Sequence, residues 1–226
     1  MSIPKIFPFV EGQGDTAAIQ ILTRRVLEDC MPGKLAAQPV DISKPWRVVH
    51  VQNLLKSEKG VEAGKWIRFL KTATRQGASA VLLVLDGDSL GGKCPADTAR
   101  KLAGIAKQQG AGVGFSVAVV FAMQEIETWF IPDAEALLGG FAGHTKSSSP
   151  IVLPVGDLEK SPRDAKGWLS EKMPNGYKPT TDQYDFAEKV NLQRIRVRNL
   201  RSFRRFEKAV LELFDAVHSG RHIATP

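Results

Sequence analysis

Four apolar runs, separated by segments of helical pattern, are the feature that most constrains what this chain can fold into. The runs are "KIFPFV" at 5–10, "WRVVHV" at 46–51, "AVLLVL" at 80–85 and "VGFSVAVVF" at 113–121. Continuous apolar runs rich in Val and Leu are typical of strands covered on both faces, and the intervening helices supply the cover. The sequence therefore predicts an α/β fold with a mainly parallel, four-stranded sheet flanked by helices. Pro8 disagrees with this interpretation, because a proline removes a hydrogen-bond donor from the ladder.

Helical spacing of apolar residues marks the segments between and after these runs. We expect helices at 15–29, 61–76, 95–109 and about 201–217. Asp15 is expected to be the N-cap of the first helix. Thr180, with Gln183 three residues later, has the pattern of a capping box and predicts the start of a further helix.

The pattern changes after about residue 132, where helical segments are separated by turns. The segment "GGFAGHTKSSSP" at 139–150 is rich in Gly and Ser and predicts a loop. We expect an α/β domain at residues 1–138 and a mostly helical extension at 139–226 that packs on the same domain. The last helix has an apolar face and a basic face. The apolar face holds Phe203, Phe206, Val210, Leu213 and Val217, and the basic face holds Arg201, Arg204, Arg205 and Lys208.

Acidic residues stand directly after two of the predicted strands. Asp86 and Asp88 end the third apolar run, and residues two apart on an extended segment point the same way. Glu11 follows the first run directly. Sites in parallel α/β sheets form outside the carboxyl ends of the strands, so these three carboxylates are expected to meet. They would repel one another unless a hard cation neutralised them, and oxygen ligands suit Mg²⁺ or Mn²⁺.

Further acidic residues follow the fourth run, in "AMQEIETWFIPD" at 122–133. If this segment is helical, Glu125 and Glu127 do not share a face, because residues two apart on a helix point in different directions. We therefore expect at most one of them to join the cation site. Trp129 and Phe130 are interpreted as core residues.

The net charge of +7 and the pI near 9.5 favour a polyanionic partner. The positive charge is concentrated near the C-terminus, where residues 189–208 contain eight Lys or Arg and one Glu. A basic helix face is common in proteins that bind no polyanion, so solubilisation is the alternative to phosphate binding. In the phosphate-binding interpretation, Lys178 joins Arg201, Arg204 and Arg205.

Composition restricts the class of protein. Hydrophobic residues make up 43% of the chain and charged residues 24%, as in ordinary globular proteins. The two cysteines, Cys30 and Cys94, have no metal-ligand spacing and are expected to be unpaired thiols in a reducing compartment. No run approaches the ~18 apolar residues of a membrane span, and the N-terminus lacks the features of a signal peptide. We expect a cytoplasmic protein.

The residues resemble the Toprim fold, which has a Glu-Gly at the end of its first strand and an Asp-x-Asp at the end of its third. Here these are Glu11 with Gly12, and Asp86 with Asp88. Five segments in this order are similar to a family of stand-alone Toprim-like proteins of bacterial phage-defence loci. They are "VEGQGDTA", "VLDGDS", "QEIETWFIPD", "YKPTTDQ" and "RSFRRFEKAV". Asp15 departs from the pattern, which tends to have glutamate at that position.

The resemblance implies that Glu11 acts as a general acid or base while Asp86 and Asp88 hold Mg²⁺. This chemistry is the hydrolysis of a phosphodiester in nucleic acid, DNA or RNA. Neither Tyr177 nor Tyr184 is placed as a topoisomerase nucleophile would be, because both lie in the helical extension. Hydrolysis is therefore preferred to strand passage.

A second hypothesis is a catalytically weak, Toprim-like binding module that acts with an ATPase or another effector partner. The acidic residues favour the nuclease. The absence of a Lys or Arg beside the acidic motifs in the sequence leaves room for the binding module.

Overall fold

The computed structural model describes residues 3–139 and 151–226 and has an α/β fold built on one parallel sheet. The sheet order is β2-β1-β4-β5-β6, and β3 also pairs with β1. Every strand pair in this sheet is parallel. The strands are β1 (Lys5–Val10), β2 (Asp41–Ile42), β3 (Trp46–Arg47), β4 (Ala80–Asp86), β5 (Ser116–Ala122) and β6 (Ala224–Thr225).

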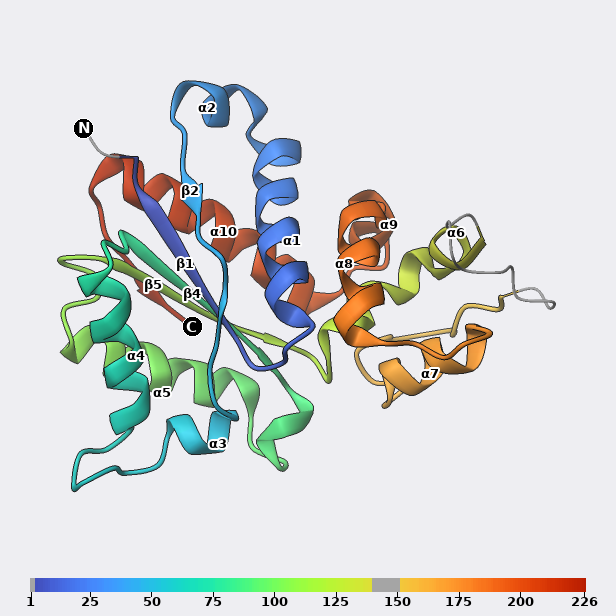
Figure 1. Cartoon of the computed structure of the whole chain (residues 1–226), viewed down its shortest axis with the longest axis horizontal. Helices are drawn as coiled ribbons and strands as arrows, with labels where there is room; N and C mark the ends of the chain where they lie inside the picture. Colours follow the sequence, from blue (N-terminus) through green and yellow to red (C-terminus); the bar gives the residue numbers. More distant parts are fainter. Residues whose placement is uncertain (1–2, 140–150) are drawn as a thin grey trace.

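Helices cover both faces of the sheet (Figure 1). One face packs against α1 (Asp15–Cys30) and α10 (Arg201–Ser219), and α2 (Pro32–Ala37) follows α1. The other face packs against α3 (Val51–Leu54), α4 (Gly64–Arg75) and α5 (Pro95–Gln108). Three short 3-10 turns are η1 (Asp88–Leu90), η2 (Ile126–Trp129) and η3 (Ile131–Asp133). The core therefore has two parts, one on each side of the sheet.

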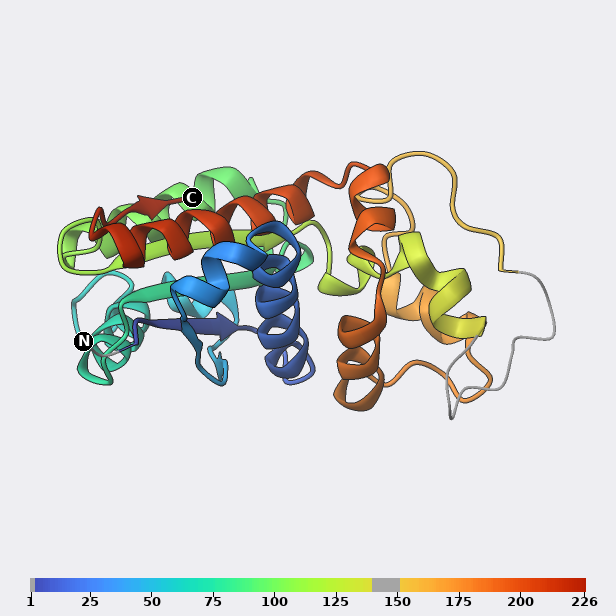
Figure 2. The same ribbon diagram turned by 90° about the horizontal axis from the view of Figure 1, so that it is seen from above.

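The remaining helices gather beyond one end of the sheet (Figure 2). They are α6 (Ala134–Gly139), α7 (Ala165–Lys172), α8 (Pro179–Lys189) and α9 (Leu192–Val197). Helix α8 packs against α1, and α7 lies against η2. These helices stand next to the carboxyl ends of the strands, where α/β proteins form their sites.

Successive residues of β4 alternate between the two parts of the core. Leu82 and Val84 belong to the α1 and α10 side, and Val81 and Leu83 belong to the α4 and α5 side. All four side chains are fully buried. Burial on both faces explains why the run is apolar throughout instead of alternating with polar residues.

The predicted α/β fold with a parallel sheet flanked by helices is confirmed, but the sheet of the described residues has six strands where four were predicted. Helices predicted at 15–29, 61–76, 95–109 and 201–217 occur at Asp15–Cys30, Gly64–Arg75, Pro95–Gln108 and Arg201–Ser219. The second apolar run is a weaker strand than predicted. Two short strands, β2 and β3, take its place, with Pro45 between them, and the chain after Arg47 turns into α3.

The break between β2 and β3 explains how β1 accommodates Pro8. The carbonyls of Pro4, Ile6 and Val10 accept hydrogen bonds from the β2 and β3 side. The backbone N of Pro8 faces the same side, because even-numbered residues of this strand share a direction. β1 pairs with β2 at Ile6 and with β3 from Phe9, so the missing N–H falls where no strand requires it.

The helical extension contributes more to the sheet than expected. Helix α10 packs on β5, and β6 adds a two-residue strand beside it. The sequence analysis did not predict β6, because two residues show no periodicity. The predicted loop at 139–150 lies, apart from Gly139, outside the described residues. Within the described residues, no helix is both long and apolar enough to cross a membrane.

Replacing Phe206 with alanine tests how firmly α10 is built into the fold. Phe206 is fully buried, and its ring centroid lies 5.1 Å from that of Trp129, which is also buried. We expect Phe206→Ala to lower the free energy of unfolding by about 3–5 kcal/mol, measured by urea denaturation. The control is Arg204→Ala on the exposed face of α10, which should change it by about 0.5 kcal/mol or less. Equal effects would show that α10 is peripheral to the core.

Candidate carboxylate site at the strand ends

The parallel sheet brings the ends of β1 and β4 to the same edge. Val10, the last residue of β1, pairs with Val84, and Asp86 is the last residue of β4. Glu11 follows β1 directly. The turn after β4 is fixed to the end of β5, because the N–H of Gly87 donates to Ala122 O at 2.8 Å. The strand ends therefore hold Glu11 and Asp86 on neighbouring strands, as the sequence predicts.

Ser89 connects these two acidic positions. Its Oγ lies 2.8 Å from the backbone oxygen of Asp86 and 3.2 Å from Glu11 Oε2. On its other side, Glu11 Oε1 lies 3.4 Å from His50 Nε2. Burial raises the pKa of Glu11, while His50 and the Ser89 hydroxyl act in the opposite direction. Asp88 lies in η1 beside this group, and its negative charge further raises the pKa of Glu11.

Asp15 is a structural member of the site. It is the first residue of α1 and not its N-cap, which is Gly14. Its carboxylate accepts hydrogen bonds from Gly12 N–H and from Gln183 Nε2, both at 2.8 Å. Asp15 thus joins the loop after β1 to helix α8, and the capping role predicted for it is wrong.

The capping box predicted for Thr180 and Gln183 at the start of α8 is also wrong, because Gln183 contacts Asp15 instead. The helix begins at Pro179 after the N-cap Lys178, whose N–H donates to Asp182 Oδ2 at 2.6 Å. Gln183 is therefore free to reach Asp15. A Cβ on Gly14 would lie 2.1 Å from Gln183 Oε1 and 2.6 Å from Pro179 O, so the close approach of α8 requires glycine there.

A lysine lies among the acidic groups. Lys166 Nζ is 3.0 Å from Glu125 Oε1, 3.6 Å from Glu127 Oε2 and 4.0 Å from Asp86 Oδ2. Its backbone N–H also donates to Glu125 Oε2 at 3.1 Å. The expectation that no Lys or Arg lies beside the acidic motifs holds for the sequence but not for the structure. Lys166 belongs to α7, so no spacing within the motifs could have revealed it.

Glu125 and Glu127 both face Lys166, so these two side chains share a direction although a helix would have separated them. The segment is not an α-helix at this point. Glu125 has extended backbone angles, φ −140° and ψ 159°, and the 3-10 turn η2 begins only at Ile126. The predicted core role of Trp129 and Phe130 is confirmed, since both are fully buried.

The electrostatics of the site are dominated by burial. Glu127 is fully buried and accepts a hydrogen bond from Tyr177 Oη at 3.3 Å. Burial raises the pKa of Glu127 to about 7, although Lys166 opposes this. Burial, together with the charge of Asp15, raises the pKa of Asp86 well above its usual range. Burial alone would lower the pKa of Lys166, but the facing carboxylates outweigh it and raise the pKa.

The donor set fits a hard divalent cation. Asp86 Oδ1 and Glu127 Oε2 are buried atoms without a hydrogen-bond partner, and carboxylate oxygens are the ligands that Mg²⁺ and Mn²⁺ prefer. Within residues 3–139 and 151–226, no three His, Cys, Asp or Glu side chains are already grouped as ligands of one ion. The ammonium of Lys166 provides positive charge to the acids in this arrangement.

The predicted phosphate-binding residues lie on two elements. Lys178 is exposed at the N-cap of α8, next to Tyr177. Arg201, Arg204 and Arg205 lie in the first two turns of α10. Arg205 is largely occupied, since its guanidinium donates to Pro226 O, to Thr225 Oγ1 at 2.9 Å and to Glu212 Oε2 at 3.2 Å. Arg204 is exposed, whereas Arg201 Nε lies 3.5 Å from Glu159 Oε2.

The raised pKa of Glu127 predicts a pH-dependent stability. The pKa of Glu127 is 4.5 in the unfolded chain and about 7 in the folded protein, so between these two pH values only the folded protein keeps the proton on Glu127. Stability therefore falls as pH rises through this window, by up to about 3 kcal/mol. Urea denaturation from pH 5 to 7.5 should show a smaller fall for Glu127→Gln than for the wild type.

Asp86 contributes with the same sign, and the charge of Glu127 is one cause of the raised pKa of Asp86, so Glu127→Gln should reduce both contributions to the fall. Glu135→Gln on the exposed side of α6 is the control and should follow the wild type. Parallel curves for the wild type and Glu127→Gln would contradict the assignment.

Removing the ammonium should expose the repulsion among the carboxylates. We expect Lys166→Met to lower the free energy of unfolding at pH 8 by about 2 kcal/mol, less than for a fully buried pair because 36% of the Lys166 side chain is exposed. Lys160→Met is the matched control, since Lys160 forms an exposed ion pair with Asp157 and should lose about 0.5 kcal/mol or less. A loss for Lys166→Met no larger than the control's would contradict this account.

Comparison with known proteins places the chain in a family. The family model described as Domain of unknown function (DUF4276) matches residues 10–211. This span contains every carboxylate of the site, together with Lys166 and Tyr177. No curated protein and no solved structure matches the chain. Because the matched span covers most of the sequence, the protein belongs to the DUF4276 family.

Proposed function

We propose that this protein is a Toprim-like, metal-dependent phosphodiesterase that hydrolyses nucleic acid. The observation that supports this most is the position of Glu11 and Asp86 at the ends of two neighbouring strands, where Asp86 Oδ1 is a buried atom without a hydrogen-bond partner. A buried acceptor of this kind needs a cation or a donor. The proposed fold relationship rests on the sequence resemblance and is compatible with the parallel sheet.

In this proposal, Asp86 and Asp88 hold Mg²⁺ or Mn²⁺ together with Glu11, and Glu125 or Glu127 supplies a further oxygen. A bound divalent cation supplies Lewis-acid stabilisation of the charge that develops on a phosphodiester. The donors come from β1, β4 and the segment after β5, three neighbouring strands of one sheet.

Glu11 is proposed to move the proton of the attacking water. Its Oε atoms face His50 and Ser89, so its orientation is fixed from both sides. Fixed orientation is what a general acid or base requires. The site also contains an ammonium, Lys166, that can attract the phosphate and offset the repulsion between it and the carboxylates.

Lys178, Arg201, Arg204 and Arg205 are proposed to contact the phosphate backbone of DNA or RNA. Arg201 and Arg204 are exposed, whereas Arg205 also holds the C-terminus. Tyr177 donates to Glu127, which supports a structural role for it rather than a nucleophilic one. We further propose a cytoplasmic, defence-related role, with an ATPase as partner.

One observation favours the alternative, a binding module with weak catalysis that serves such a partner. The ammonium of Lys166 already lies within 3.0–4.0 Å of three carboxylates and compensates part of their charge. A cation would have to compete with it. The experiment below distinguishes the two functions.

Cleavage of labelled single- and double-stranded DNA and RNA should require Mg²⁺ or Mn²⁺ and stop with a chelator. We expect Asp86→Asn and Glu11→Gln each to reduce the rate by about 10²-fold or more, because the first removes a cation ligand and the second the proton carrier. Asp215→Asn is the control and should retain the wild-type rate, since Asp215 is exposed and paired with Lys34. No cleavage with any metal, or equal rates in all variants, would favour the binding module.

A further inference from the structure

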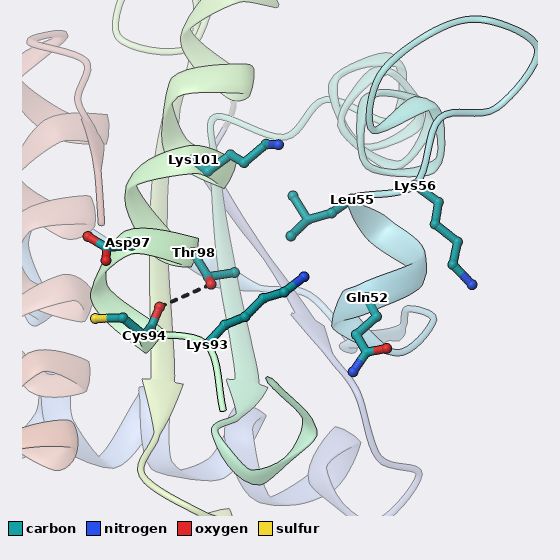
Figure 3. Close-up of a pocket in the computed structure, with 8 residues that line it drawn as sticks. All are labelled: Gln52, Leu55, Lys56, Lys93, Cys94, Asp97, Thr98 and Lys101. Carbon is teal, nitrogen blue, oxygen red and sulfur yellow. Dashed lines mark hydrogen bonds between the residues drawn. The ribbon is translucent and has the colours of Figure 1, made fainter. Parts of the chain in front are cut away.

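Three lysines line a groove in the surface of the protein (Figure 3). It has a volume of about 570 Å³ and lies between α3 and the N-terminal part of α5. Lys56 comes from the segment after α3, Lys93 from the loop before α5, and Lys101 from α5 itself. We call these three residues and the space between them the lysine groove. Figure 3 shows Lys93 and Lys101 extending from the α5 side toward the α3 side.

The lysine groove has an excess of positive charge. Of the residues that the structure describes, none forms an ion pair with Lys56 or Lys93. Lys101 Nζ lies 2.6 Å from Glu62 Oε1, but both side chains are at least half exposed. The acidic residue of the lining, Asp97, pairs with Arg100. Uncompensated lysines in a concave surface attract anions.

The groove and the carboxylate site share a wall. Gln52, which lines the groove, donates from Nε2 to the backbone oxygen of Ser89 at 3.2 Å. The hydroxyl of the same Ser89 lies 3.2 Å from Glu11 Oε2. Lys93 follows directly after Gly91 and Gly92, whose φ values of +59° and +86° lie in the left-handed region that favours glycine. Ser89 therefore connects the wall of the groove to Glu11.

A cluster of carboxylates by itself repels a phosphodiester, the substrate proposed for this site, because both are negatively charged. A phosphodiester chain has one negative charge per nucleotide, so it must be held by cations on either side of the reacting phosphate. Lysine binds phosphate as a point charge on a flexible stem, which suits a backbone without a fixed sequence. A volume of about 570 Å³ suits a short stretch of one strand better than a duplex.

We infer that the lysine groove binds the phosphodiester backbone of a single nucleic-acid strand and so places the adjoining phosphate at the carboxylates. This inference rests on the proposed function for the reaction that follows, but the binding itself does not require cleavage. None of the three lysines belongs to the basic stretch at 189–208, where the charge of the sequence is concentrated.

The test measures binding of a fluorescein-labelled 20-nucleotide single strand by anisotropy, in a chelator so that no cleavage interferes. The groove variant has Lys56, Lys93 and Lys101 all changed to Gln. The control variant has Lys34, Lys71 and Lys107 changed to Gln, which removes the same net charge from exposed positions elsewhere. Urea midpoints verify that both variants remain folded.

We expect the groove variant to bind at least 10-fold more weakly than the wild type and the control variant at most threefold more weakly. The slope of log K against log salt concentration should become shallower by about 2 in the groove variant, because three contacts to a single strand are lost. Equal losses in the two variants, or no binding by the wild type, would overturn the inference. ATP displacing the strand as effectively as unlabelled strand does would also overturn it, in favour of a nucleotide site.

The inference and the proposed function fail separately. If the groove variant binds weakly and the wild type cleaves nothing with any metal, the strand-binding role of the lysine groove is supported and the nuclease function is rejected. If the wild type shows metal-dependent cleavage and the groove variant binds like the control variant, the nuclease function is supported and the strand-binding role of the lysine groove is rejected.

Discussion

Parallel pairing of β1, β4 and β5 is the constraint on which the rest of this structure depends. It makes every strand end at the same edge, so the residues that follow β1, β4 and β5 must share one small volume. In this chain each of those three segments contains an acidic residue, namely Glu11, Asp88 and Glu125. An antiparallel arrangement would have divided the same carboxylates between two edges, and the repulsion that the structure has to compensate would not arise.

Compensation for that repulsion determines how the helical extension docks. Lys166 from α7 places its ammonium among the acids, Tyr177 donates to Glu127, and Gln183 from α8 donates to Asp15. Each of these contacts joins the extension to a strand end. The same polar contacts therefore hold the extension on the sheet and form part of the carboxylate site. This explains why the extension lies against the strand ends instead of folding away from them.

The sequence predicts features that depend on residues close together in the chain, and it does not predict contacts between residues far apart in the chain. Apolar runs and the acids that follow them are local patterns, so the strands β1, β4 and β5 and the positions of Glu11 and Asp86 were predictable. Lys166 and Gln183 reach the site through tertiary packing over more than 40 residues of chain. The periodicity of apolar residues within a segment gives no information about such contacts. Glu125 was misjudged because an extended residue interrupts what resembles a helical segment.

The break in the edge strand at Pro45 has a consequence for how the protein behaves at high concentration. An exposed sheet edge presents a row of unpaired backbone groups on which a second chain can add a strand. Here the edge beside β1 consists of two pairs of residues, β2 and β3, separated by a proline, and β1 has its own proline opposite the gap. A neighbouring molecule finds no continuous ladder to extend at this edge, which protects the sheet from growing into an aggregate.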